Sequence, residues 1–341
     1  MDLCFNREVP FIRWALQAGL PREPMVVVDV GVQGGEHRRW RVFGDRLVVH
    51  GFDAIREAVE DLRVRNRGQP GRYYHWAALG DEEGERELFF NAADPYSSSL
   101  YRQGDDSYTV AGQRRDEVRS VSMHRLDSYL ESGTIAQADV MKVDVEGFEK
   151  NVLLGARKLM SSGLLALVVE TSFGASPEYP QTHFGALLKI ASAHGLRLYD
   201  FDFNRIPTAA FQAALERTAN RRIADHHSVG KISTVDALFC RDLVAEREHP
   251  ESYTSLPAPV GPEKILKMMM VLESHGLNDI AVDLAQRFRN ELAPLFDVDE
   301  GIRLLADRDC RIDGAAEALR RSINWIVRAP LRLGRQLILR F

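Results

Sequence analysis

The stretch that decides the fold is residues 25–35, which read MVVVDVGVQGG. A run of apolar, mostly β-branched residues ends here in Asp29 and then in glycines at the spacing Asp-x-Gly-x-x-Gly. A strand that is apolar on both faces is typical of a buried parallel sheet. Glycines directly after such a strand allow a sharp turn and a close approach of the backbone to a ligand. Residues 25–35 therefore predict a strand followed by a ligand-binding loop or by a merely tight turn.

The acid at the start of this glycine loop narrows the class of ligand. Dinucleotide-binding loops begin with a glycine where this chain has Asp29. An acid therefore favours a ligand without a pyrophosphate, and S-adenosylmethionine, which carries a cationic sulfonium, has that character. A helix is expected over 36–43, and its first amide groups would point toward a carboxylate of the ligand.

Outward from this loop, apolar runs alternate with helical patterns. Strands are expected at 25–30, 47–53, 73–79, 139–144, 164–170, 196–201 and 235–240, and helices at 36–43, 55–66, 148–160 and 183–194. The alternation predicts an α/β fold with a doubly wound, mostly parallel sheet. Residues 85–130 interrupt it with strands at 85–91 and 117–123 and a helix at 126–131. Between these two strands, the polar stretch 92–116 indicates a substrate lid or a disordered loop.

The chain divides into three predicted segments. These are an N-terminal helical segment (1–24), the α/β domain (25–245) and a helical C-terminal extension (246–341). Helices at 262–274 and 278–293 are expected to form an antiparallel pair, with a role in packing or in a homo-oligomer. Residues 318–341 hold six arginines and no acid. They predict a helix packed on the protein or a basic amphipathic helix on an anionic membrane surface.

Composition bounds the class of protein. The 341 residues are 45% hydrophobic and 27% charged, as in ordinary soluble proteins. The net charge of −5 gives no reason to expect nucleic acid as a partner. Three well-separated cysteines and the absence of an apolar leader favour a cytoplasmic protein without disulfides.

Acids follow several of the expected strands, at the edge where a doubly wound sheet binds its ligands. Asp53 ends the second strand, where such folds bind a ribose diol. Ala78 leaves room for an adenine ring after the third strand. Asp144 and Glu146 follow the fourth strand, just before the next expected helix. The dipole of that helix favours acids in its first turn, but this accounts for only part of the run of acids. Lys142, within that strand, is expected to form an ion pair with a neighbouring acid.

With these motifs in place, the chain resembles the FkbM family of S-adenosylmethionine-dependent methyltransferases, over residues 25–242. The matching motifs are DVGVQG (29–34), FDA (52–54), ALG (78–80), SSSL (97–100), LD (126–127), KVDVEGFE (142–149), VVE (168–170) and DALF (236–239). Val32-Gln33 replaces the family's Ala-Asn, and Asp53-Ala54 replaces Glu-Pro. The resemblance implies a seven-stranded class I methyltransferase sheet, S-adenosylmethionine as cofactor, and O-methylation of a small-molecule or glycan acceptor.

These arguments assign site residues, and no metal is expected. Candidate catalytic residues are Asp144, Glu146, Glu170 and His183, with His124 as a weaker candidate base. Candidate cofactor-binding residues are Asp29, Gly31, Gln33, Gly34, Asp53, Ala54, Ala78 and Asp144. Candidate substrate-binding residues are Tyr96, Ser98, Ser99 and Tyr101. Asp127 is expected to be a helix N-cap.

Two other classes of function stay open from the sequence. A binding module that has lost turnover would assemble a biosynthetic complex, although the acids at the strand ends argue against it. The alternative of a nicotinamide-dependent sugar oxidoreductase is less favoured, because the loop lacks the first glycine of the dinucleotide-binding pattern.

Overall fold

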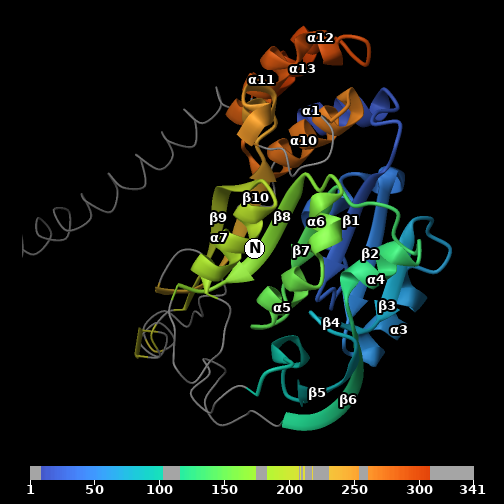
Figure 1. Cartoon of the computed structure of the whole chain (residues 1–341), viewed down its shortest axis with the longest axis vertical. Coiled ribbons are helices and arrows are strands. Elements are labelled where there is room, and N and C mark those ends of the chain that lie inside the picture. The colour runs from blue at the N-terminus through green and yellow to red at the C-terminus, as the bar shows by residue number, and fades with distance from the viewer. Residues whose placement is uncertain are drawn as a thin grey trace, which may run out of the picture.

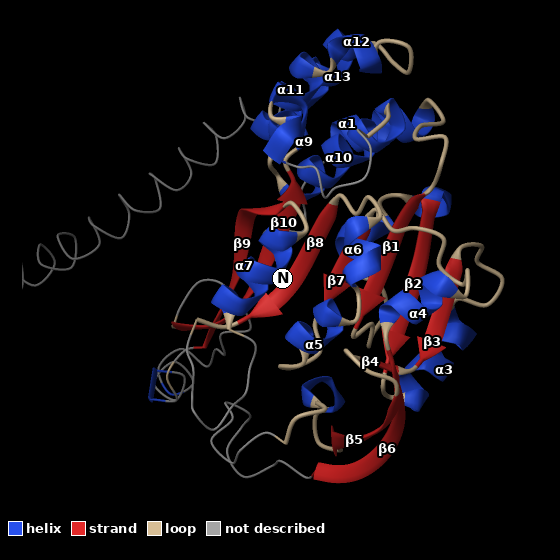
Figure 2. Cartoon of the chain, in the orientation of Figure 1, coloured by secondary structure: helices blue, strands red, loops and turns tan. Residues whose placement is uncertain are grey.

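A seven-stranded sheet forms the centre of the computed structural model, which describes residues 9–102, 116–173, 183–206, 230–252 and 260–307, with positions 208, 210, 211 and 217. Its strand order is β3-β2-β1-β7-β8-β10-β9 (Figure 2). Only β10 is antiparallel to its neighbours. The strands are β1 (Met25–Val30), β2 (Leu47–Asp53), β3 (Arg72–Trp76), β7 (Val140–Val143), β8 (Ala166–Thr171), β9 (Leu196–Ile206) and β10 (Lys231–Arg241). The doubly wound, mostly parallel sheet expected from the sequence is confirmed.

Apolar residues pack on both faces of this sheet, as predicted from strands that are continuously apolar and do not alternate with polar residues. On β1, Met25 and Val27 belong to one buried cluster, while Val28 and Val30 belong to a second cluster on the other face. Around the sheet lie α2 (Arg38–Arg41), α3 (Arg56–Arg65), α4 (Leu126–Glu131), α5 (Glu149–Leu154), α6 (Arg157–Ser161) and α7 (Phe184–Ala193), whereas α9 (Leu243–Glu248) lies beside α11 (Asn278–Arg287) at the far end of β10 (Figure 2). Short 3-10 turns are η1 (Gly44–Arg46), η2 (Pro95–Ser97) and η3 (Pro250–Ser252).

A smaller three-stranded sheet lies beyond the carboxyl ends of the central strands (Figure 1). It contains β4 (Ala78–Leu79), β5 (Gly84–Asn91) and β6 (Asp116–His124). The strand expected over 73–79 is therefore wrong in its second half. The chain leaves the central sheet after Trp76, and Ala78 pairs with Met123 of β6. The strands expected at 85–91 and 117–123 are confirmed as β5 and β6, and the intervening residues 103–115 lie outside the described residues.

Two expected helices are shorter than the sequence pattern suggested. The helix expected over 36–43 is reduced to α2, residues 38–41, and His37 is its N-cap. The helix expected over 148–160 is divided into α5 and α6 at Gly155. A Cβ on Gly155 would lie 1.8 Å from the carbonyl oxygen of Gly80, so this position packs directly against another backbone segment.

Together with α9, five further helices of the described chain gather at the amino ends of the parallel strands, away from the small sheet (Figure 1). They are α1 (Pro10–Gln17), α10 (Pro262–His275), α11 (Asn278–Arg287), α12 (Arg289–Leu292) and α13 (Val298–Ala306). The expected helices at 262–274 and 278–293 are thus present, the second divided into α11 and α12. The segment boundaries at 24 and 245 stay a prediction, and the arginine-rich stretch 318–341 lies outside the described residues. Within the described part of the chain, no helix is long and apolar enough to cross a membrane.

Buried charges join α10 to the rest of the molecule. Lys267 is 0% exposed, and its Nζ donates to Asp139 Oδ2 at 2.8 Å and to the carbonyl oxygen of Pro24 at 2.7 Å. Glu273, also 0% exposed, accepts hydrogen bonds from the backbone N–H groups of Phe11 and Ile12 at the start of α1. Polar groups this deeply buried are stable only with such partners. The extension is therefore anchored to both the sheet and the N-terminal helix.

Candidate functional site

A cavity of about 310 Å³ opens at the carboxyl ends of β1, β2 and β7. This is the edge at which doubly wound sheets bind their ligands, and the volume is within the usual range for a small-molecule site. Among the residues assigned from the sequence, its wall contains Asp29, Gly31, Gln33, Asp53, Ala54, Ala78, Tyr96, Ser98, Ser99, Asp144 and Glu146. The assigned residues Gly34, Tyr101, Glu170 and His183 do not line it. Most of the residues assigned from the sequence therefore lie in the wall of one cavity.

Asp29 is the most deeply buried acid of the cavity. It lies on β1 opposite Lys142 of β7, and it is 2% exposed. Burial raises its pKa to about 6, although the positive charge of Lys142 acts in the opposite direction. Its Oδ1 has no hydrogen-bond partner within the described residues. A buried acceptor without a partner is costly, so Asp29 fits a ligand that brings a donor or a positive charge.

Asp53, at the end of β2, both supports the backbone and lines the cavity. The side chain is 7% exposed and lines the cavity, and burial raises its pKa to about 6. Its Oδ1 also accepts the backbone N–H of Ile55 at 2.8 Å, which shapes the turn into α3. The carboxylate therefore holds the turn and still lies at the cavity wall, where a ligand hydroxyl can reach it.

The glycines of the loop after β1 pack against protein. Gly31 has a φ of 84°, and a Cβ there would lie 1.8 Å from the carbonyl oxygen of Asp144. Gly34 lies beside Tyr96, whose Oη would be 3.0 Å from an added Cβ. Only glycine fits at position 31, because two backbone segments meet there. Gly31 therefore packs against the backbone of Asp144 and still lines the cavity, so the expected close approach of the loop to a ligand stays a prediction.

Lys142 and Asp144 form the expected ion pair, with Nζ and Oδ2 2.8 Å apart. Burial opposes the charge of Lys142, but the carboxylates of Asp144, Asp29 and Asp236 together hold its pKa above the usual range. The pair lies in the cavity wall. Lys142 therefore stays charged and fixes the orientation of the Asp144 carboxylate.

His37 lines the same cavity and was missed by the sequence reasoning. Its Nδ1 accepts the backbone N–H of Arg39 at 3.4 Å. Burial, together with the charges of Arg39 and Lys142, lowers its pKa to about 3, so the ring is neutral. With Nδ1 acting as acceptor, the proton of the neutral ring resides on Nε2. The signal in the sequence was a histidine directly after the glycine loop, at the position that caps the next helix.

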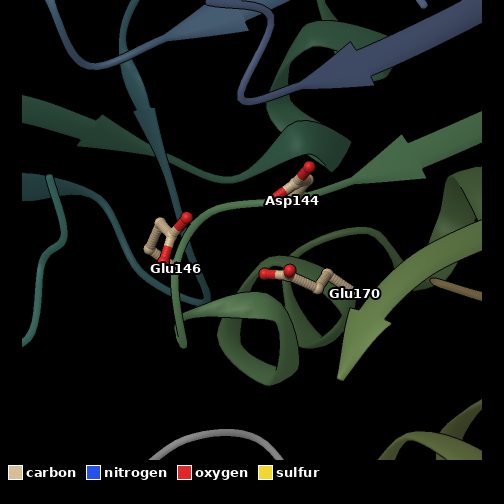
Figure 3. A group of neighbouring side chains, drawn as sticks. All are labelled: Asp144, Glu146 and Glu170. Carbon is tan, nitrogen blue, oxygen red and sulfur yellow. The ribbon is translucent and has the colours of Figure 1, made fainter. Parts of the chain in front are cut away.

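Three carboxylates meet beside the cavity, at the turn between β7 and α5 (Figure 3). Asp144 and Glu146 come from the turn, and Glu170 comes from β8. One oxygen from each lies within 4.8 Å of the others. Burial and the carboxylates of Asp144 and Glu146 hold the pKa of Glu170 well above its usual range. The group can accept a proton, and its oxygens could also ligate a cation. The expectation of no metal therefore stays a prediction.

The remaining assigned residues lie further from the cavity or bind protein. His183 is exposed at the N-cap of α7, and His124 on β6 contacts Glu83 at 2.7 Å. Tyr101 packs on Phe148 and contacts Asn151 through its hydroxyl group. Asp127 caps a helix other than its own. It lies inside α4, and its carboxylate accepts the backbone N–H groups of Lys158 and Leu159 at the start of α6.

Comparison with known protein families identifies the domain that forms this cavity. The family model of the methyltransferase FkbM domain matches residues 32–198, from the glycine loop to the start of β9. The chain carries a methyltransferase FkbM domain. The resemblance read from the motifs is thereby confirmed, and the seven-stranded, mostly parallel sheet that it implied is present. No curated protein matches the chain.

Solved structures with a similar fold are also methyltransferases by their descriptions. Methyltransferase FkbM from Methylobacillus flagellatus KT has a TM-score of 0.36 and 15% identity, over 68% of this chain and 48% of that one. Magnesium protoporphyrin IX methyltransferase from Synechocystis PCC 6803, with bound SAM, has a TM-score of 0.31 and 10% identity, over 68% and 76%. N-methyltransferase NodS from Bradyrhizobium japonicum WM9 has a TM-score of 0.31 and 10% identity, over 70% and 98%. These likenesses leave the methyl acceptor of this chain open.

Proposed function

We propose that this chain is an S-adenosylmethionine-dependent O-methyltransferase that acts on a hydroxyl group of a sugar, a glycan or a natural product. The observation that carries the proposal is the acid-lined cavity at the strand ends of a methyltransferase domain. Within it, Asp29 offers a buried acceptor that has no partner in the described part of the chain. The choice of a hydroxyl acceptor rests on the family resemblance.

The residues of the cavity fit the cofactor. Asp53 would accept hydrogen bonds from the ribose hydroxyls, and Asp29 would face the ammonium group of the methionine moiety. Between Leu79, Leu88 and Phe148, the cavity offers apolar surface for the adenine ring. When bound, S-adenosylmethionine supplies an electrophilic methyl group on sulfur.

The protein's part in the reaction is to orient the acceptor and to take its proton. Positioning the hydroxyl for in-line attack accounts for much of the rate in such transfers. Glu170 suits the role of general base, because a raised pKa brings a carboxylate close to the operating pH. Asp144 is less available for this role, because its Oδ2 is already bound to Lys142 Nζ at 2.8 Å. At least one of Asp144, Glu146 and Glu170 is needed for turnover.

Two measurements separate this proposal from its alternatives. Titration calorimetry of the full chain with S-adenosylmethionine, and separately with NAD, tests the class of cofactor. Transfer of a labelled methyl group to a panel of glycans and nucleotide sugars then tests turnover. Saturation by S-adenosylmethionine with transfer supports the proposal, and saturation without transfer to any acceptor would favour a binding module. Saturation by NAD alone would indicate an oxidoreductase.

A further inference from the structure

The turn between β7 and α5 contains an unusual backbone conformation. Glu146 has a φ of 56°, and it is the one residue other than glycine with a positive φ in the described part of the chain. This left-handed region is unfavourable for a residue with a Cβ, and it persists only where the surroundings impose it. Because Glu146 belongs to the group of three carboxylates, the cause of its conformation bears on the site.

Ser99 holds the carbonyl side of Glu146. Its hydroxyl donates to the backbone oxygen of Glu146 at 2.8 Å and accepts the backbone N–H of Tyr101 at 3.0 Å. The side chain is 2% exposed, and its own backbone is paired with Phe89 of β5. Ser99 is therefore a fixed point on the small sheet, and it binds the turn from across the cavity.

Glu149 binds the backbone of the two residues that flank Glu146. Its Oε1 accepts the backbone N–H of Gly147 at 2.9 Å and the backbone N–H of Val145 at 3.2 Å. The side chain is 2% exposed at the start of α5. Burial raises the pKa of Glu149 to about 7, and hydrogen bonds from the backbone N–H groups of Gly147, Glu149 and Val145 act against this rise. The carboxyl group of Glu149 is thus buried, which is unfavourable for its charge, and it binds both neighbours of the left-handed residue Glu146.

We propose that Ser99 and Glu149 are positioning residues, which hold Glu146 in the left-handed conformation and so keep its carboxylate beside those of Asp144 and Glu170. The inference rests on the proposed function, because it assigns these carboxylates to the acceptor side of a methyltransferase site. If the hydrogen bonds of Ser99 or those of Glu149 are lost, Glu146 relaxes toward an ordinary backbone conformation. Its carboxylate then moves away from those of Asp144 and Glu170. Ser99 thus acts through Glu146, where the sequence predicted a substrate contact.

Loss of this carboxylate also changes the titration of Glu170. The acids that raise its pKa are Asp144 and Glu146 of the turn, Asp236 of β10 and Glu149 of α5. Lys142 of β7 is the nearby cation, bound to Asp144. Ser99→Ala removes no charge, so a shift in the pH profile reports a movement of Glu146. The acid limb of the kcat profile should move to lower pH, because one repelling carboxylate has moved away.

A double-mutant cycle tests the proposal by activity. We expect Ser99→Ala to lower kcat about 10–100-fold, with the Kd of S-adenosylmethionine within twofold of wild type. In a Glu146→Gln background, Ser99→Ala should lower kcat less than twofold further, because the carboxylate it positions is already gone. Glu149→Gln, which keeps an acceptor oxygen, should retain more activity than Glu149→Ala. An equal loss from Ser99→Ala in both backgrounds, with a raised acceptor KM, would instead mean direct contact with the acceptor.

A second cycle uses thermal unfolding and needs no turnover, so it separates this inference from the proposed function. Glu146→Gly and Glu146→Ala both remove the carboxylate, but only glycine removes the Cβ that disfavours a positive φ. Glu146→Gly should therefore have the higher Tm in the wild-type background. The difference should shrink when Ser99→Ala is added, because the backbone is then free to relax. An equal Tm for the two variants, or a difference that Ser99→Ala leaves unchanged, would overturn the proposal even in a chain that transfers methyl groups.

Discussion

At the scale of single residues, the buried carboxylate of Asp29 lowers the stability of the folded protein but suits the binding of a ligand. Asp29 is buried with an acceptor oxygen that has no partner in the described structure, and burial raises its pKa from 3.8 to about 6. That increase corresponds to about 3 kcal/mol of unfavourable free energy in the ionised, folded state. A group kept at such a cost in a cavity is a candidate for function.

We predict that Asp29→Asn stabilises the protein without ligand at pH 8 by about 2–3 kcal/mol, because it removes a buried charge. The folded-state pKa of Asp29 is raised, so its favourable contribution is present near pH 4 and is lost as the pH rises through 6. The gain from the substitution should accordingly shrink toward pH 4. Urea unfolding at both pH values measures it, and a gain independent of pH would show that the charge of Asp29 is not the cause.

For Glu170, we predict that substitution by Gln lowers the rate of methyl transfer about 10²–10⁴-fold, the usual effect of losing a general base. The wild-type rate should rise with pH through the raised pKa of Glu170, because only the carboxylate accepts a proton. Single-turnover kinetics at saturating cofactor measures both effects. Glu87→Gln, which changes an exposed carboxylate on β5, is the control. A near wild-type rate for Glu170→Gln would remove Glu170 from this role.

At the scale of secondary structure elements, the sequence located strands well and helix ends poorly. Strands buried on both faces of a parallel sheet are apolar along their length, so an apolar run marks the whole strand. The runs 25–30 and 47–53 accordingly match β1 and β2. Helix ends depend on contacts distant in the sequence, as at Gly155, where the backbone of Gly80 leaves no room for a Cβ. Asp127 likewise belongs to α4 by sequence and caps α6 in space. No local pattern contains that information.

The cap on α6 gives a prediction at this scale. Asp127 is 4% exposed, and its carboxylate binds the backbone N–H groups of Lys158 and Leu159. We expect Asp127→Ala to lower the free energy of unfolding by about 1–2 kcal/mol, the upper range for a lost helix cap. Asp127→Asn, which keeps one acceptor oxygen, should lose less. Guanidinium unfolding followed by circular dichroism compares the two, and equal losses would show that the acceptor oxygen is not what matters.

At the scale of the whole molecule, the site and the helical extension lie at opposite ends of the parallel strands (Figure 1). Most of the site residues predicted from motifs line the cavity, because residues such as Asp29, Asp53 and Asp144 lie at or directly after the carboxyl ends of their strands. Glu170 was predicted from its strand end, but its approach to Glu146 required the sheet order. The network of Asp139, Lys267 and Glu273 joins segments more than 100 residues apart, and neither periodicity nor motif spacing predicts such pairs.

This network predicts that the extension is needed for stability. We expect Lys267→Met to lower the free energy of unfolding by about 3–5 kcal/mol, because it leaves the Asp139 carboxylate buried with one partner fewer. Lys189→Met, an exposed position on α7, is the control and should change little. Urea unfolding of the full chain measures both. If Lys267→Met is as stable as the control, the buried pair is not what anchors α10.

The central claim is that the cavity at the strand ends binds S-adenosylmethionine through its acids. The measurement that tests it most directly is titration calorimetry of S-adenosylmethionine into the wild type, Asp53→Asn and Asp53→Ala. We predict saturable binding by the wild type and a loss of about 1.5–3 kcal/mol, or roughly 10–150-fold in Kd, for Asp53→Ala. Asp53→Asn, which keeps the bond to Ile55, should lie between them. No binding by the wild type, or one Kd for all three proteins, would contradict the claim.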